Sequence, residues 1–400
     1  MSGPYTDAPL SRHKGSQEFR LVELQPNSLS DPIRCILRAY SFDSDPPSYT
    51  ALSYTWGPKV KHENIELNGA CFPVGRSLWA FLEQMRLQSK FGMYWIDAVC
   101  IDQESVLERN YQVQMMRQIY ANAKTVSIWL GEADINMSSD IAMGFLQEML
   151  LSQGDAGSQI VWSEETARAV SKLLNRPYWS RIWIVQELFL ARSIVIFCGS
   201  RHCEWRALDH LANTVFRHAR INKIIEIGHL KAVQLGLARK LYQVELKYLS
   251  LLELLVTFSN HEATNVLDKV YGVCGLARGG TDFIIDYDIL PEDLLIRLLY
   301  YICTYTTQLE RRVLTDFIIV VSATLDVRWS HEEMTAQVDV LQKTYNCLAT
   351  TKDEHQRMSD GSITVGLMLP QPPHESSYNE DVAARLKRAI LMPNSIDISL

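Results

Sequence analysis

The stretch YWIDAVCIDQESVLERNYQVQMMRQIYANAKTVSIWLGE, residues 94–132, decides the fold class. Its first part belongs to the apolar run MYWIDAVCI (93–101), which predicts a buried strand, and its last part contains TVSIWLG (125–131), which predicts another. Between them, residues 104–123 carry apolar side chains at helical spacing. Two apolar strands joined by a helix are typical of a parallel sheet covered on both faces, because half-exposed antiparallel strands would alternate.

Further strands precede this unit. Residues 19–24 and 33–40 are short alternating runs separated by a turn-rich segment, which predicts paired strands. The run YTALSYTWGP (49–58) predicts another strand, and Asn68-Gly69 lies between two short apolar runs, as in a type I′ hairpin. We therefore expect an α/β fold in which helices flank a mostly parallel sheet, followed by a mainly helical C-terminal extension.

Length and composition divide the chain into four parts. A chain of 400 residues favours two domains, or one domain with a large helical extension. The polar composition of residues 1–18 predicts a disordered tail, and removing the part before Ser16 should leave stability nearly unchanged. We expect the α/β domain over residues 19–205 and a helical region packed on it over residues 206–330. Within that region, residues 316–325 could add a strand. Residues 331–400 predict a C-terminal extension that is partly loop.

Charge and cysteine content argue against several classes of protein. The formal net charge of −7 comes without a basic stripe, so no nucleic-acid partner is expected. No apolar run reaches the roughly 18 residues of a membrane helix, and the polar start does not resemble a signal peptide. We therefore expect a cytoplasmic protein without a membrane partner. The eight cysteines are scattered singly, which predicts buried, reduced thiols.

Polar and aromatic side chains follow the predicted strands, at the sheet edge where open α/β folds bind ligands. Tyr54 and Trp56 follow one strand, and Asp97 and Gln103 follow the next. A buried carboxylate without a partner is costly, so Asp97 should be paired or hydrogen-bonded. Two interpretations stay open: Asp97 belongs to a functional site, or it is held structurally by backbone N–H groups or by an arginine. The arginines in question are Arg109 and Arg181.

The apolar helix PYWSRIWIVQELFLA (177–191) carries Arg181, Gln186 and Glu187. Glu187 follows two tryptophans at successive four-residue spacings, so the three side chains share a face. A carboxylate beside indoles tends to have a raised pKa, which suits general acid–base chemistry or the binding of a sugar hydroxyl. The alternative is a buried ion pair between Arg181 and Asp97 or Glu187 that ties the helix to the sheet.

Metal and cofactor motifs are weak in this sequence. Cys198, His202 and Cys203 offer three ligands without an evident fourth, so no metal site is expected. The sequence has no phosphate loop with Gly-Lys-Ser/Thr and no dinucleotide-binding glycine loop, so no cofactor is expected. Cys100, in the middle of a predicted strand, is more typical of a buried hydrophobe than of a nucleophile.

Several of these segments, in this order, resemble the heterokaryon-incompatibility (HET) domain of filamentous fungi. The matching strings are YTALSYTWG, the NG of the hairpin, residues 94–132, RPYWSRIWIVQELFLA and SIVIFCG. Carried over by position, the signature residues are Ser53, Tyr54, Trp56, Gly57, Asp97, Cys100, Gln103, Glu108, Arg109, Gln112, Arg181, Trp183, Gln186 and Glu187. Asp102 and Ser77 depart from the family pattern, since each stands where the family often has Asn.

The resemblance implies a role in non-self recognition and programmed cell death. HET domains are also said to resemble Toll/interleukin-receptor (TIR) domains, some of which cleave NAD with a helix glutamate. The resemblance to the HET domain therefore further implies a TIR-like core and NAD as a substrate. The candidate catalytic residues are Glu187, Asp97 and Glu108. The candidate ligand-binding residues are Tyr54, Trp56, Gln103, Arg109, Arg181, Trp183 and Gln186.

Several functions stay open at this point. A small-molecule enzyme of specialised metabolism could reuse the same crevice, and a non-enzymatic scaffold would need the polar groups of the crevice to be merely structural. A small-molecule or nucleotide ligand is compatible with the first two roles. A protein partner or self-association is compatible with a signalling role.

Overall fold

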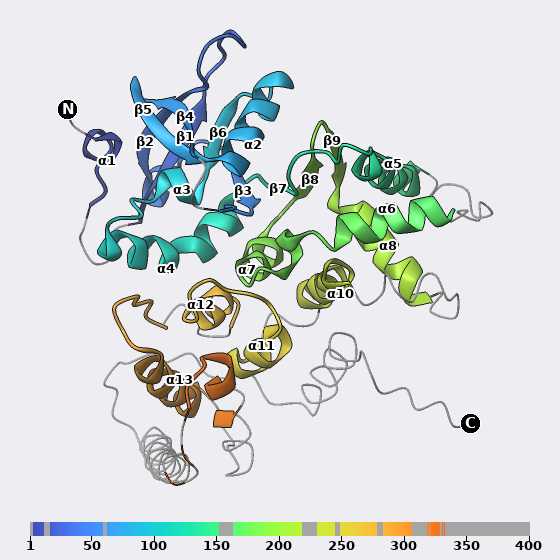
Figure 1. The fold of residues 1–400 in the computed structure, drawn as a ribbon. Coiled ribbons are helices and arrows are strands. Elements are labelled where there is room, and N and C mark those ends of the chain that lie inside the picture. The colour runs from blue at the N-terminus through green and yellow to red at the C-terminus, as the bar shows by residue number, and fades with distance from the viewer. Residues whose placement is uncertain are drawn as a thin grey trace, which may run out of the picture. The chain divides into compact units, whose positions relative to one another are not determined.

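The fold is taken from a computed structural model and is described for part of the chain (Figure 1). The described residues are 3–11, 17–58, 62–151, 163–217, 230–244, 249–277, 283–305, 318–319, 321–328, 330 and 332. The described residues divide into two compact units, one that ends at Val244 and one that begins at residue 249. Each unit is described by itself.

Nine strands form one sheet in the described part of the first unit, in the order β5-β4-β2-β1-β6-β3-β7-β8-β9. The strands are β1 (Glu18–Leu24), β2 (Arg34–Ser41), β3 (Thr50–Tyr54), β4 (His62–Leu67), β5 (Ala70–Gly75), β6 (Gly92–Trp95), β7 (Thr125–Trp129), β8 (Ile194–Cys198) and β9 (Arg201–Glu204). The central strands β6, β3, β7 and β8 run parallel to one another, and β2 runs parallel to β4.

The sheet is mixed, whereas the sequence predicted a mostly parallel one. The pairs β1–β2, β1–β6, β4–β5 and β8–β9 are antiparallel. Three of these pairs join strands that follow each other along the chain through short connections, and a short connection requires antiparallel pairing. The α/β class is confirmed, and the parallel arrangement holds for the centre of the sheet.

Helices cover both faces of the sheet, as expected. Adjacent residues of a strand point to opposite faces. In β6, the ring of Tyr94 contacts Phe81 of helix α2 (Arg76–Leu87), with centroids 5.9 Å apart. The next residue, Trp95, contacts Tyr120 of helix α4 (Val106–Asn122) at 5.4 Å. Helices α2 and α4 therefore lie on opposite faces of the sheet.

The predicted strand over residues 93–101 is shorter than expected. Strand β6 ends at Trp95, and residues 97–100 form the helical turn α3 (Asp97–Cys100). The carboxylate of Asp97 accepts a hydrogen bond from the N–H of Ala98 at 2.7 Å, a local bond that competes with strand pairing. Cys100 therefore lies in a helical turn and not in the middle of a strand.

The remaining helices of the first unit follow β7 along the chain, and one expected helix is divided in two. They are α5 (Ser138–Leu151), α6 (Glu164–Leu174), the 3-10 turn η3 (Pro177–Ser180), α7 (Trp183–Leu190), α8 (Trp205–Arg217) and α10 (Lys231–Val244). The single helix expected around residues 178–191 is thus divided into η3 and α7, with Arg181 at the junction.

Residues 3–11 differ from the disordered tail expected over residues 1–18. They contain the short helix α1 (Pro4–Asp7), and Ala8 is buried. The ring of Tyr5 meets that of Phe72 edge-on at 6.4 Å, and the N–H of Ser11 donates to Glu18 at 2.5 Å. This segment therefore packs on the sheet, so its removal is not expected to be neutral.

The second unit contains α11 (Leu251–Phe258), α12 (Asp268–Cys274) and α13 (Pro291–Tyr305). Pro291 begins α13, as expected for a first helical turn. Residues 318–319 and 321–324 are helical and residue 325 lies in a turn, so the additional strand considered over 316–325 is wrong. Apart from residue 332, the expected extension over 331–400 lies outside the described residues.

Two further expectations concern membranes and thiols. Among the helices that the structure describes, none is both long and apolar enough to cross a membrane. Six described cysteines are free thiols: Cys35, Cys71, Cys100, Cys198, Cys203 and Cys274. Five of them are buried as predicted, and Cys71 is exposed.

The aromatic contacts of α2 predict a large effect of shortening Phe81. Its ring is fully buried and also contacts Trp129 at 5.9 Å and Phe197 at 6.5 Å. Phe81→Ala should lower the free energy of unfolding by about 3–5 kcal/mol, measured by denaturant titration. Leu87→Ala is the control on the same helix. Because Leu87 is 54% exposed, this variant should lower the free energy of unfolding by under about 1 kcal/mol. Similar losses in both variants would contradict the packing described here.

Candidate functional site

The outer layer of the candidate site lies where β3 and β6 end. Trp56 follows β3 and is 41% exposed, and its Nε1 donates to Oδ2 of Asp97 at 2.9 Å. Gly57 has a φ of 78°, a left-handed conformation that favours glycine, and it turns the chain directly after the indole. Gln103 donates from Nε2 to the backbone carbonyl of Asp97 at 3.0 Å. Two strand ends are thereby joined through one carboxylate residue.

An inner layer lies beneath it and consists of Ser53, Tyr178 and Glu187. The Ser53 hydroxyl donates to Oε2 of Glu187 and lies 2.7 Å from the Tyr178 hydroxyl. Because the serine has one proton, which goes to the carboxylate, the tyrosine must donate to Ser53. Glu187 is only 2% exposed. This buried cluster fastens α7 and η3 to the middle of β3.

Arg181 supplies the positive charge of the site. Its Nη1 donates to the backbone carbonyl of Tyr54, at the end of β3. Burial raises the pKa of Glu187 to about 7, while the charge of Arg181 and the hydrogen bond from Ser53 oppose this rise. Burial likewise raises the pKa of Asp97, again opposed by Arg181 and by the Trp56 hydrogen bond. One guanidinium therefore acts on two carboxylates, and each carboxylate also has a hydrogen-bond donor of its own.

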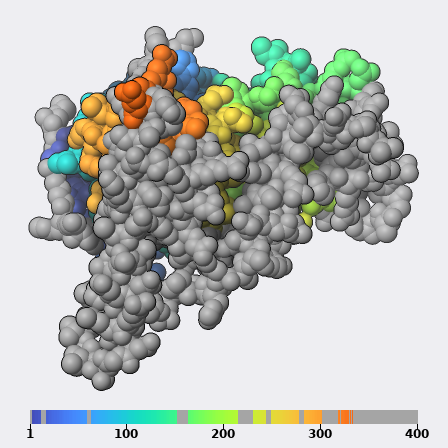
Figure 2. Space-filling model, turned by 90° about the horizontal axis from the view of Figure 1, so that it is seen from below, coloured from blue at the N-terminus to red at the C-terminus, as the bar shows by residue number. Residues whose placement is uncertain are grey.

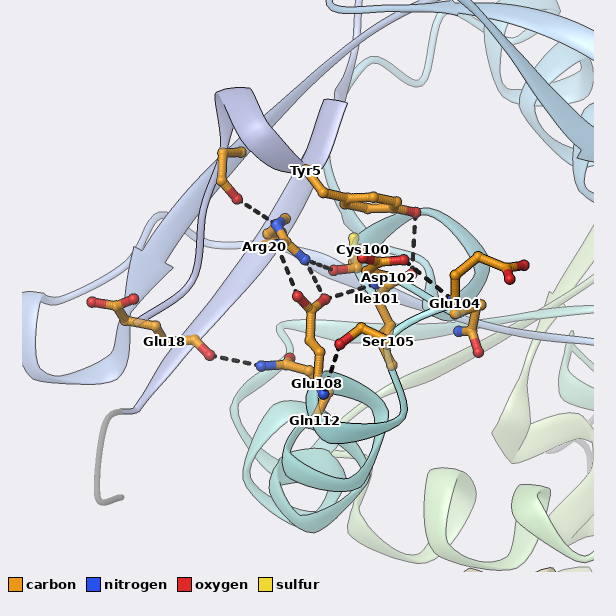
Figure 3. A network of polar contacts seen from close by, with 12 residues as sticks. Tyr5, Glu18, Arg20, Cys100, Ile101, Asp102, Glu104, Ser105, Glu108 and Gln112 are labelled. Atoms are coloured by element: carbon orange, nitrogen blue, oxygen red, sulfur yellow. Dashed lines mark hydrogen bonds and ion pairs between the residues drawn. The ribbon is translucent and has the colours of Figure 1, made fainter. Parts of the chain in front are cut away.

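Glu108, the third candidate catalytic residue, belongs to a different network (Figure 3). Arg20 of β1 is 1% exposed and binds both carboxylate oxygens of Glu108, at 2.5 and 3.1 Å. The same carboxylate accepts from the N–H of Asp102 at 2.7 Å. Because both oxygens are engaged in a charge-assisted pair, the geometry favours a structural role for Glu108 and leaves Glu187 as the glutamate of the site.

The other candidates are dispersed around these two networks. Trp183 and Gln186 lie on α7, the first half-buried and the second 2% exposed. Tyr54 is buried at the end of β3, and burial raises the pKa of its hydroxyl well above the usual value. Arg109 is half-buried on α4, beside Glu108. Burial raises the pKa of Cys100 to about 12, so its thiol stays protonated near neutral pH and is not a thiolate nucleophile.

Sequence reasoning missed two of the residues that build these networks. Arg20 is the one arginine of β1, a strand whose residues 19–22 are all buried, and such an isolated charge signals a buried partner. Tyr178 gave no comparable signal, because a tyrosine among tryptophans is typical of ordinary core. Within the described ranges, no group of three or more His, Cys, Asp or Glu side chains is placed to hold a metal ion.

A groove between α5 and α6 lies apart from these networks. The two helices lie next to each other, and their side chains are seen in teal and green on the face shown in Figure 2. The groove is lined by Asn136, Ser138, Ile141, Glu164, Glu165, Arg168, Ala169 and Lys172. Its basic groups are paired with neighbouring acids, Arg168 with Glu164 and Lys172 with Asp134. None of the candidate site residues lines it.

Comparison with known proteins identifies the domain that carries the site. Residues 49–187 match the family described as Heterokaryon incompatibility protein (HET). The chain contains a HET domain. The matched span begins just before β3 and ends at Glu187, so it includes both layers of the candidate site and excludes β1, β2, β8 and β9.

One curated relative of the HET-domain chain is heterokaryon incompatibility protein 6, OR allele, of Neurospora crassa. The two sequences are 28% identical over 66% of this chain and 48% of the relative. The chain therefore spans about half the length of the curated relative it matches. No solved structure matches the chain.

The raised pKa of Glu187 predicts a pH-dependent effect of Glu187→Gln. A folded-state pKa near 7, above the unfolded value near 4.3, means that the folded protein holds the proton more tightly. Stability from this group is then fully present below about pH 4 and is lost as pH rises through about 7. The difference in free energy of unfolding between Glu187→Gln and wild type should therefore shift in favour of the variant by up to about 3 kcal/mol as the pH rises from 5 to 8.

Denaturant titrations at four pH values from 5 to 8 would measure this difference. Glu104→Gln is the control, because Glu104 is an exposed acid in the same domain and should give a profile parallel to wild type. A parallel profile for Glu187→Gln as well would show that Glu187 is ionised in the folded protein at pH 5.

The Arg20–Glu108 pair predicts a second large loss of stability. Glu108→Gln leaves the buried guanidinium without its anion and should lower the free energy of unfolding by about 3 kcal/mol or more. Glu23→Gln, in the exposed pair with Arg38, should cost under about 1 kcal/mol. Thermal and denaturant unfolding of both variants would test this contrast. Equal losses would mean that burial does not strengthen the Arg20–Glu108 pair.

Proposed function

We propose that this chain is a fungal HET-domain protein that acts in non-self recognition, and that its activation arrests or kills the cell. The match of residues 49–187 and the name of the Neurospora relative support the recognition role. The protein acts in the cytoplasm, where a protein partner or self-association triggers it. The death response requires an effector activity, for which the two-layered site is the candidate.

The observation that carries the effector proposal is the placement of Glu187 beneath an exposed aromatic and acidic surface. Trp56 offers an accessible indole, the Asp97 carboxylate beside it can accept hydroxyl protons, and Arg181 provides a cation. An indole, a carboxylate and a guanidinium suit a ligand with a flat ring, sugar hydroxyls and an anionic group. A nucleotide has all three features.

The reaction proposed for this site is hydrolysis of the glycosidic bond of NAD. The C1′–N bond breaks, its electron pair leaves on the nicotinamide nitrogen, and a water oxygen bonds to C1′. The proton of that water passes to Glu187, whose pKa of about 7 suits a base that must bind and release a proton near neutral pH. In this mechanism the parallel strands β6, β3, β7 and β8 form a TIR-like core, by analogy of fold.

A small-molecule enzyme of specialised metabolism is the alternative that the same geometry supports. A carboxylate with a pKa near neutrality serves general acid–base catalysis on many substrates. The two functions differ in the molecule consumed. Incubating the purified protein with NAD and with a panel of cell metabolites, and following turnover by mass spectrometry, would separate them.

Glu187→Gln provides the decisive variant. It keeps the shape of the side chain and removes its charge, so the variant should fold with a near-normal melting temperature at pH 7. Growth arrest in a fungal host with inducible expression, and any turnover found, should fall by on the order of a hundredfold. Asp97→Asn should weaken the response too, and Glu104→Gln should not. A stable Glu187→Gln protein with full activity would contradict the proposed role.

A further inference from the structure

Three different elements hold the backbone of residues 100–102, here called the loop, which starts at the last residue of α3 (Figure 3). Its first carbonyl accepts from Arg20 of β1 at 3.1 Å, and the second accepts from the hydroxyl of Tyr5 at 3.1 Å. The N–H of its third residue donates to Glu108 of α4 at 2.7 Å. Each successive residue of the loop is thus fixed by a different part of the chain.

The Tyr5 contact is part of a larger attachment of residues 3–11, here called the N-terminal strap. The guanidinium of Arg20 lies over the Tyr5 ring, 4.9 Å from its centroid. The Nε of Arg20 donates to the carbonyl of Ala8 at 2.6 Å. One buried arginine therefore binds the strap through Ala8 and Tyr5, the loop through its first carbonyl, and α4 through Glu108.

This loop is the connection between two residues of the candidate site. It joins Asp97, which holds the Trp56 indole, to Gln103, whose amide returns to the Asp97 carbonyl. A shift of the loop would therefore move both of them. Tyr5 and Arg20 lie outside the span 49–187 that defines the HET domain by similarity.

The geometry points to Tyr5 and Arg20 as positioning residues of the site. The N-terminal strap holds the loop so that Asp97 and Gln103 keep their ligand-binding geometry. Release of the strap disrupts this geometry and abolishes the activity of the site. What the site does rests on the proposed function, whereas the mechanical role of the strap does not. The competing view is that the strap contributes only to overall stability.

Hydrogen exchange separates the two views. Tyr5→Phe removes the bond to the loop and keeps the ring beneath Arg20. Tyr49→Phe is the matched control, because its hydroxyl donates to a different carbonyl, that of Ile119, at 2.6 Å. In the full-length protein, Tyr5→Phe should speed amide exchange in peptides covering residues 97–104 by about fivefold, the scale of one lost hydrogen bond. Tyr49→Phe should leave these peptides unchanged.

Deleting residues 1–11 removes the whole strap and should speed the same exchange by about tenfold or more, with β7 and β8 unaffected. Unchanged exchange in both strap variants, or acceleration spread evenly over the sheet, would overturn the proposal. The response in the inducible fungal host should fall by roughly the factor by which the loop loosens. A stronger response would also overturn it, because the strap would then restrain the site instead of completing it.

Comparison with Asp97→Asn keeps this inference distinct from the proposed function. If Asp97→Asn loses the response while the loosened Tyr5→Phe protein keeps it in full, the positioning role is wrong. If the loop loosens but neither variant alters the response, the site does not perform the proposed function, and the mechanical role of the strap is still supported.

Discussion

Burial of the Glu187 carboxylate against β3 is the interaction on which the site depends. A carboxylate out of water is stable only if donors and positive charge replace its hydration. Ser53 and Arg181 do so from β3 and from the junction of η3 with α7. Because these groups come from segments more than 120 positions apart, the need to satisfy one carboxylate fixes how the helix meets the sheet.

The second buried charge, Arg20, has the corresponding role on the N-terminal side. A guanidinium has donors in a fixed planar arrangement, so its partners must come to it in defined directions. Three separate segments supply acceptors in those directions: the carbonyls of Ala8 and Cys100 and the carboxylate of Glu108. The outer layer, with Asp97, is therefore placed by rigid polar geometry and not by apolar packing alone.

Much of this arrangement could be predicted from the sequence, because strand and helix periodicity depends on near neighbours. The α/β class, helix α4 and the meeting of Trp56 with Asp97 at neighbouring strand ends followed from such patterns and from the family resemblance. The pairing of Arg20 with Glu108 spans 88 positions, and no local pattern specifies a partner at that distance. The end of β6 was also missed, because an apolar run does not show that an aspartate will bind the next backbone N–H.

The strand order shows that the HET match covers only part of the sheet. Residues 49–187 contain β3 to β7, but β1 and β2 separate β4 from β6 in the sheet, and β8 covers the other side of β7. Cut out alone, this span would leave the β4–β5 hairpin without its neighbour and expose unpaired backbone along β6 and β7. Open strand edges of this kind promote aggregation. The segment recognisable by similarity is therefore smaller than the sheet to which it belongs, and it depends on the flanking strands β1, β2 and β8 to pair its open edges.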